Sequence, residues 1–286
     1  MDVLVVSVLS GFSYGMVLFL LATGLSIVLG LMGVVNLAHG MLFMIGAYLG
    51  ITVGNATGSF VLGIICGVVA AGISGLIIER GFLRRLYKQE LEQILVTFGF
   101  IYIITNLHLW IYGPYPRSGI VPPLLKHAVT IGRYDVTFYR LAVIVVGALL
   151  CVCLYLLQEK TKIGAAIRAG MDDPEMVYAS GINLRNVNIA AFVFGALLAG
   201  FAGVVGAPVL GGVNITTGGD VIFVAIAVCI VGGVGSVQGA LVGALLIGVI
   251  TSLMQAYLPS VAIYVMYILM VIILISKPSG IIGKTS

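Results

Sequence analysis

Charge is the feature that this sequence most lacks. Only 8% of its 286 residues are Asp, Glu, Lys or Arg, whereas about 25% of the residues in soluble domains are charged. Residues 3–78 contain none of these four. A charge at the middle of a bilayer costs about 2.5–3.5 kcal/mol, and one span needs roughly 20 apolar residues. The uncharged stretch is much longer than that, so the chain is predicted to cross a bilayer several times.

The sequence also lacks the short alternating segments that are typical of membrane β-barrels. Its apolar runs are long and continuous, which favours helices, because backbone groups in lipid must be paired within a helix or a closed barrel. We therefore predict an all-α, polytopic membrane helix bundle of about eight or nine transmembrane helices, with broken or re-entrant segments. One transmembrane domain is expected to occupy residues 1–286. No basic segment precedes the first apolar run, so this run is expected to stay in the mature protein.

Groups that could hold a metal or carry out catalysis are scarce. The four cysteines lie in apolar runs and the three histidines are scattered, so no metal site and no membrane-embedded active site is expected. The tail contains Lys284 and Thr285 after a glycine, but Pro278 stands where a phosphate-binding loop needs glycine. No cofactor or nucleotide is therefore expected to bind this chain. The net charge of +4 comes from residues beside the spans and does not indicate nucleic-acid binding.

The few charges gather in islands. The first island covers residues 79–92 and includes Lys88, the second covers residues 117–140 and includes Arg133, and the third covers residues 159–185. The tail adds Lys277 and Lys284. One apolar span separates each island from the next, so the first and third share a side. Lys and Arg are densest there, which predicts that this side is cytoplasmic. The N-terminus is then outside and the C-terminus cytoplasmic, and residues 113–140 form an outer loop containing a structured turn or short hairpin.

Glycine, in contrast, is abundant, with 39 residues. Several recur at four-residue spacing, as do Gly46, Gly50 and Gly54. Such rows lie on one helix face and let neighbouring backbones approach closely. They predict a compact bundle, although any one row could instead form a contact between two copies of the chain.

Two glycine-rich interruptions, at residues 30–40 and 232–239, indicate broken helices. Unwound backbone at membrane depth survives only under protein or beside a water-filled cavity, and a pair of such segments is typical of a transport pathway. Six of their residues are candidates for a substrate pathway: Asn36, His39, Gly40, Gly233, Gly235 and Ser236. The alternative is a pair of tight turns in which the polar residues cap helices and His39 makes a structural hydrogen bond.

Asp220 is the only charged residue between positions 186 and 276. It follows Gly218 and Gly219, and a helix is expected to follow it. Asp220 would then cap that helix at the outer edge of the membrane and meet the positive end of its dipole. In the alternative interpretation it faces the substrate pathway, where it contacts an ammonium group or relays protons.

The third island carries the strongest local signal. Asp172 and Asp173 precede Pro174, Glu175 follows, and Gly181 closes the segment. An acidic N-cap, a proline at the first helical position and a glycine after the end predict a helix of about two turns. A helix this short is not stable alone. It must be held by the bundle or by a partner protein, unless it is an ordinary capped loop between helices.

Three motifs resemble those of the permeases of branched-chain amino-acid ABC importers, and the resemblance spans nearly the whole chain. The first is Asn36-Leu-Ala-His39-Gly40. The second is Gly232-Gly233-Val-Gly235-Ser236. The third comprises the residues of a cytoplasmic coupling segment: Arg168, Asp172, Ala179 and Gly181 with Ile182. The tail from Lys277 to Gly283 is also similar to the family's ending, except that Ile282 stands where phenylalanine is common.

The resemblance implies an import system in a bacterial inner membrane. Such a permease pairs with a second homologous permease, two cytoplasmic ATPase subunits that bind the ATP, and a periplasmic or extracellular substrate-binding protein. Residues 174–180 would seat in an ATPase subunit and drive alternating access. The other hypotheses are a stand-alone ion-coupled secondary transporter with Asp220 as the coupling residue and, less supported by the sequence, a channel or a membrane-embedded enzyme.

Overall fold

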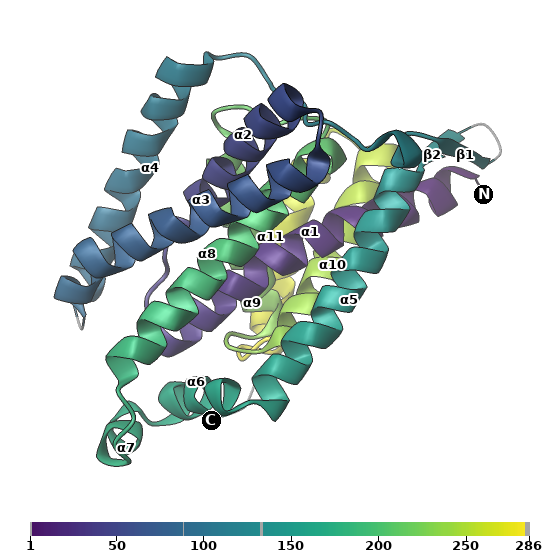
Figure 1. Ribbon diagram of the computed structural model, residues 1–286. Coiled ribbons are helices and arrows are strands. Elements are labelled where there is room, and N and C mark those ends of the chain that lie inside the picture. Colours follow the sequence, from purple (N-terminus) through teal and green to yellow (C-terminus); the bar gives the residue numbers. More distant parts are fainter. Residues whose placement is uncertain (1, 88, 132–133, 284–286) are drawn as a thin grey trace.

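The computed structural model describes residues 2–87, 89–131 and 134–283. It consists almost entirely of helices (Figure 1). The long ones are α1 (Asp2–Met32), α2 (His39–Thr57), α3 (Phe60–Gly81), α4 (Glu90–Tyr112), α5 (Phe138–Lys160), α8 (Leu184–Val209) and α10 (Val237–Tyr257). The shorter ones are α6 (Lys162–Asp172), α7 (Pro174–Ala179), α9 (Thr217–Gly232) and α11 (Ala262–Ser276). Single 3-10 turns cover Leu83–Leu86 and Pro123–Leu125.

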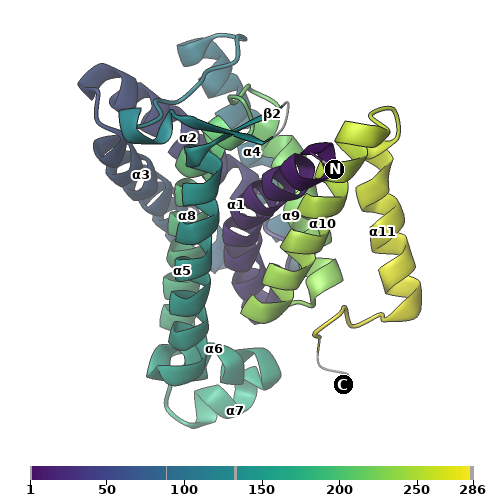
Figure 2. The ribbon, with the colours of Figure 1, turned by 90° about the vertical axis from the view of Figure 1, so that its right-hand side faces the viewer.

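The predicted membrane bundle is confirmed. Seven helices of the described chain are long and apolar enough to cross a membrane, and Thr217–Gly232 and Tyr264–Ser276 are shorter apolar helices. Together they agree with the expected eight or nine. Helix α1 begins beside the hairpin, while α11 ends at the opposite end of the bundle, the end at which α6 and α7 lie (Figures 1 and 2).

The loop at residues 113–140 contains the short hairpin that the sequence suggested. Strands β1 (Ala128–Ile131) and β2 (Tyr134–Thr137) pair antiparallel. Arg117, at the start of the same loop, pairs with Val213 through an isolated bridge. The loop is thereby tied to the connection between α8 and α9. Lys88, Arg133, Lys284 and Thr285 lie outside the described residues.

Helix α1 forms the centre of the bundle, and most of its length is buried. It packs against α8, α9, α10 and α5. Glycines make these contacts close, as the repeated four-residue spacing predicted. A Cβ atom on Gly46 would overlap the backbone of Gly200, and one on Gly248 would lie 2.6 Å from the Gly11 carbonyl oxygen. Helix α4, by contrast, stands away from the bundle (Figure 1) and is mostly exposed.

Candidate functional site

The first interruption is a non-helical segment, residues 33–38, between α1 and α2. Gly33 ends α1 with a positive φ of 71°, which glycine adopts without steric cost. The Asn36 carboxamide oxygen accepts a hydrogen bond from the Ala38 amide at 3.1 Å, and the Asn36 carbonyl accepts one from the His39 amide at 3.2 Å. The predicted break is confirmed, and Asn36 satisfies backbone donors within it.

His39, the first residue of α2, lies deep inside the protein. Its ring fills the space left by two glycines: a Cβ on Gly24 would lie 3.0 Å from Nε2, and one on Gly195 would lie 3.3 Å from Cε1. Nε2 has no hydrogen-bond partner within the described chain. Since Gly195 is near the middle of α8, helix α2 begins halfway through the bundle. This is the broken-helix geometry that the sequence predicted.

Helix α9 begins at the same depth. A Cβ on Gly40 would overlap the Gly218 carbonyl oxygen, and one on Gly218 would lie 2.9 Å from the Gly40 carbonyl oxygen. The first turns of α2 and α9 are therefore in direct backbone contact. Glycine is therefore needed at position 40 of the motif because the backbones of α2 and α9 touch there.

Asp220 lies in the first turn of α9, near the positive end of the helix dipole as expected, but the prediction that it is the N-cap is wrong. The N-cap is Thr216, and the helix already includes Gly218 and Gly219. The Asp220 carboxylate accepts a hydrogen bond from the Thr216 hydroxyl at 3.3 Å, and within the described chain it forms no ion pair. It is exposed, as is Phe223 one turn later. An exposed carboxylate thus lies at the level of the Gly40 contact, inside the depth of the bundle.

The second interruption, residues 233–236, joins α9 to α10. Gly233 and Gly235 have positive φ values of 105° and 81°. The Ser236 hydroxyl caps α10 by accepting from the Gly239 amide at 3.0 Å. The predicted break is confirmed, and the capping role that the sequence left as an alternative for Ser236 is the one observed.

Three segments are bonded to this turn or to the end of α9 just before it. The Gly235 amide donates to the Ser26 hydroxyl of α1 at 2.8 Å, and the Gly235 carbonyl accepts from the Gln158 side chain of α5 at 2.9 Å. The tail contributes the Ile281 amide, which donates to the Val231 carbonyl at 2.9 Å, and the Ile282 amide, which donates to the Gly232 carbonyl at 3.1 Å. Sequence reasoning did not single out Ser26 or Gln158, because a lone serine or glutamine in an apolar run carries no motif.

A cavity of about 720 Å³ lies beside this turn, and we call it the α6 cavity. It brings together residues from the two predicted sets. Gly235 and Ser236 come from the predicted pathway, and Arg168 and Asp172 come from the predicted coupling segment. The tail contributes Pro278, Ser279, Ile282 and Gly283 to its wall. The second interruption therefore lies next to the coupling segment.

The coupling segment consists of α6 and α7. The Asp173 carboxylate caps α7 by accepting from the Glu175 and Met176 amides, each at 3.0 Å. Gly181 follows α7 with a positive φ of 81°, so the predicted short capped helix from Pro174 to Ala179 is confirmed. The sequence did not reveal that the preceding residues form a further helix, α6.

The outer surface of α7 is apolar as well as charged. Met176 is 67% exposed and Tyr178 is 77% exposed, whereas Val177 is buried. Arg168 of α6 instead faces α5: its guanidinium donates to the Gln158 carbonyl and forms an ion pair with Glu159 at 3.5 Å. Arg168 thus positions α6 against α5, while Met176 and Tyr178 are left uncovered by the described residues.

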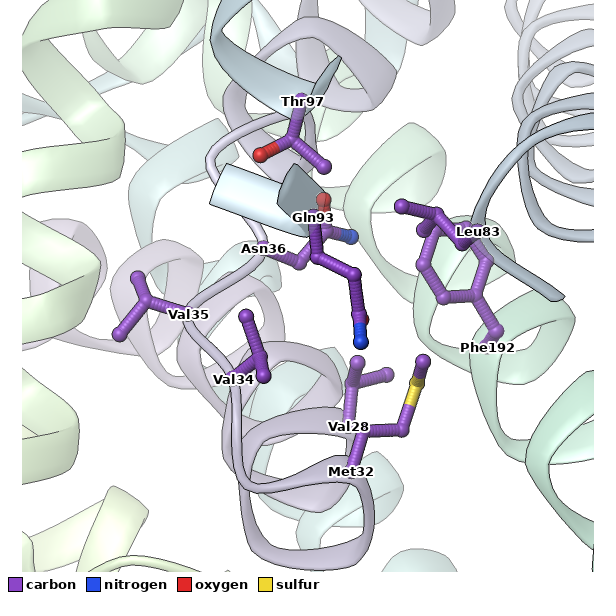
Figure 3. Close-up of a pocket in the computed structure, with 9 residues that line it drawn as sticks. All are labelled: Val28, Met32, Val34, Val35, Asn36, Leu83, Gln93, Thr97 and Phe192. Atoms are coloured by element: carbon purple, nitrogen blue, oxygen red, sulfur yellow. The ribbon is translucent and has the colours of Figure 1, made fainter. Parts of the chain in front are cut away.

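Figure 3 shows a second and much smaller cavity, next to Asn36. Its volume of about 10 Å³ is room for about one water molecule. Gln93 and Thr97 of α4 contribute to its wall, and the Asn36 side-chain nitrogen has no partner among the described residues. The cavity next to the first interruption is thus far smaller than the α6 cavity beside the second.

The two interruptions lie against different faces of α1. His39 contacts Gly24, whereas Gly235 bonds to Ser26. Residues two apart on an α-helix point about 200° apart, so α1 separates the two segments. The structure therefore does not bring the six predicted pathway residues into one site, and their role in transport remains a prediction.

A buried carboxylate lies near the end of α3. Glu79 is fully buried, and it accepts a hydrogen bond from the Tyr87 hydroxyl. Burial, and secondly the bond with Glu79, raise the pKa of the Tyr87 phenol, so the hydroxyl stays protonated and able to donate. Across the described residues, no group of three His, Cys, Asp or Glu side chains has the arrangement of a metal site.

Comparison with known proteins identifies the family. The family model described as "Branched-chain amino acid transport system / permease component" matches residues 7–275. The chain belongs to this family. The resemblance expected from the three motifs is therefore confirmed. No solved structure gives a significant match.

Individual relatives agree with the family model over nearly their whole length. The permease is 28% identical to the high-affinity branched-chain amino acid transport system permease protein LivH of Escherichia coli strain K12, over 96% of this chain and 94% of the relative. It is 26% identical to BraD of Pseudomonas aeruginosa, which has the same description, over the same shares. It is 29% identical to a probable LivH of Methanocaldococcus jannaschii, over 94% of this chain and 90% of the relative.

Proposed function

We propose that this permease is the membrane subunit of an ATP-driven importer that moves branched-chain amino acids across a bacterial inner membrane by alternating access. The observation that carries the proposal is the family match over residues 7–275. The permease itself binds no cofactor and catalyses no reaction. ATP is bound and hydrolysed by partner subunits, and a binding protein outside delivers the solute.

The proposed assembly contains a second homologous permease, two cytoplasmic ATPase subunits and a periplasmic or extracellular substrate-binding protein. The exposed side chains of Met176 and Tyr178 on α7 support a seat for this helix in an apolar groove of an ATPase subunit. The first and third charged islands, which are rich in Lys and Arg, support a cytoplasmic position for this end. The C-terminus is then cytoplasmic and the N-terminus outside.

The solute is proposed to pass along the face of α9 that carries Asp220. A charge exposed to lipid within the membrane is strongly disfavoured, and ionisable residues at this depth mark solute or ion pathways. Since Asp220 is exposed and has no ion-pair partner in the described chain, its face must meet water or another subunit. A carboxylate there can contact the ammonium group of an amino acid. This face, completed by the second permease, is the proposed pathway.

The test is uptake of leucine into proteoliposomes that contain the permease with its candidate partners. ATP inside, together with binding protein and leucine outside, should produce accumulation against a gradient, and omission of either ATPase or ATP should abolish it. Uphill uptake by the permease alone, driven by a proton or sodium gradient and lost in Asp220→Asn, would favour an ion-coupled transporter. ATP-driven uptake of urea or a short amide in place of leucine would reject the substrate assignment but keep the transport class.

A further inference from the structure

Met171, in the last turn of α6, is held between α1 and the α9–α10 turn. A Cβ atom on Gly30 of α1 would lie 3.0 Å from both the sulfur and the terminal methyl of Met171. A Cβ on Gly235 would lie 2.9 Å from the same sulfur. We call the space between Gly30 and Gly235 the glycine notch. Met171 fills it, and a side chain at either glycine would displace it.

Gly30 is the more informative of the two glycines. Gly235 has a positive φ, so glycine is favoured there for the backbone alone. Gly30 lies within the regular helix α1, where glycine is less favourable than alanine by roughly 1 kcal/mol. Neighbouring atoms leave little room for a side chain at Gly30, since a Cβ there would also lie 3.1 Å from the Gly235 Cα. The notch is thus shaped by the approach of α6 and the turn to α1.

Helix α6 is fixed along the end of α1 at more than one point. Ile167 is buried in a cluster with Ile27 and Leu31 of α1. A Cβ on Gly170 would lie 2.7 Å from the Leu31 side chain and 3.0 Å from that of Leu184. A displacement of α6 therefore presses on α1 rather than sliding freely past it.

The α9–α10 turn on the other side of the notch is tied to its neighbours. The Gly235 amide is bonded to Ser26 of α1 and its carbonyl to Gln158 of α5. The tail runs back from α11 beneath the turn (Figure 2) and is bonded to the end of α9. A push on Gly235 is therefore transmitted to α1, α5 and α9 together. Gly30, Met171 and Gly235 also line the α6 cavity, which leaves room for movement on one side of the notch.

We propose that Met171 is the positioning residue that transmits movement of α6 and α7 to the α9–α10 turn, and so couples the ATPase cycle to the opening of the pathway. The inference rests on the proposed function, because it assumes that a partner moves α7. It assigns different roles to two methionines of one segment. Met176 faces outward toward the partner, whereas Met171 faces inward against the notch.

The test separates ATP hydrolysis from transport in the reconstituted complex. Met171→Ala should leave assembly and ATP hydrolysis close to wild type, while solute imported per ATP hydrolysed falls by about tenfold, within the usual range of coupling between sites. Met171→Leu, which keeps the volume, should restore most of the ratio. Met254→Ala in α10 is the matched control, because Met254 is half-buried like Met171 but lies outside the notch.

A second pair of variants tests the notch from its other side. Gly30→Ala should also lower solute imported per ATP, because its methyl group displaces the Met171 side chain. In the double variant Gly30→Ala with Met171→Ala the two losses should not add, because the methyl group at position 30 acts mainly by displacing a side chain that is already absent. If Met171→Ala fails to assemble, Gly30→Ala and Met171→Leu still decide the question.

Three outcomes would overturn the role of Met171: an unchanged import ratio in Met171→Ala, an equal loss in Met254→Ala, or fully additive losses in the double variant. Failure of the proposed function gives a different result, since the wild-type complex itself would then not import solute with ATP. A merely structural role of Met171 predicts parallel losses of assembly, ATP hydrolysis and import, with an unchanged ratio between the last two.

Discussion

The two interrupted segments have similar sequences and different surroundings. Residues 33–38 lead into the closely packed first turn of α2, where His39 fills a space between Gly24 and Gly195 and Gly40 touches Gly218. Residues 233–236 are instead bonded to α1, α5 and the tail, and they lie beside a cavity of about 720 Å³. The first segment leads into a helix that begins at mid-depth, whereas the second joins α9 to α10 next to the coupling segment.

The difference shows that a glycine-rich break with polar residues does not identify a pathway by itself. In lipid, every unwound backbone group needs a partner from protein or water. The first segment finds its partners locally, through Asn36. The second obtains its partners from other helices, and its Gly235 lies directly against Met171 of the coupling segment. Disruption of the first should therefore affect folding, and disruption of the second should affect the link between α5, α1 and the turn.

The largest effect is expected for Gly40→Ala. The added methyl would overlap the Gly218 carbonyl oxygen, which is backbone and cannot rotate away. Overpacking of this kind costs about 3 kcal/mol or more, so thermal unfolding of the purified permease in detergent should shift strongly downward. Gly219→Ala is the control, because a Cβ there meets nothing within 4 Å. Equal melting temperatures for the two variants would contradict the close α2–α9 contact.

Tyr87→Phe should have the next largest effect. Tyr87 donates to Glu79, which is fully buried and whose second oxygen has no partner in the described chain. Loss of the hydroxyl leaves a buried acidic group without its donor, at a cost of about 1–3 kcal/mol. Thermal unfolding measures this, with Tyr257→Phe at a 54% exposed site as the control. Stability equal to that of the control would show that the buried pair contributes nothing.

For the second segment, Gln158→Leu sharpens the comparison. The Gln158 side chain donates to the Gly235 carbonyl at 2.9 Å and accepts from the Val237 amide at 3.3 Å. Its loss leaves the part-buried Gly235 carbonyl and the buried Val237 amide without this partner, so the expected loss of stability is about 1 kcal/mol. Gln255→Leu, at an exposed position of α10, should be near neutral. A loss of stability greater than that of Gly40→Ala would contradict the expectation that the first segment matters more for folding than the second.

Much of this fold follows from the sequence. Charge-free runs predicted the membrane bundle, and Pro174 with its acidic neighbours predicted α7. The positions of the breaks followed from glycine clusters. These signals are local, and the structure agrees with them because the bilayer leaves few alternatives to helices.

The parts that the sequence did not predict depend on contacts between distant residues. Gln158 and Ser26 lie in apolar runs without a motif, and Met171 resembles any other methionine until Gly30 and Gly235 are seen beside it. Asp220 was expected to cap a helix, but the helix starts earlier, at Thr217, because Asn214 accepts from the Thr216 and Thr217 amides. Asparagine at a turn competes well for such donors.

The smallest effect is expected at the ion pair between Arg168 and Glu159. Its atoms lie 3.5 Å apart, and the side chains are 33% and 41% exposed, so water and salt screen their attraction. Glu159→Gln should lower stability by no more than about 0.5 kcal/mol, and the difference from wild type should vanish in high salt. Arg168 also donates to the Gln158 carbonyl, so Arg168→Gln should cost more than Glu159→Gln. Equal losses for the two variants would mean that the ion pair, and not the backbone contact, holds α6 against α5.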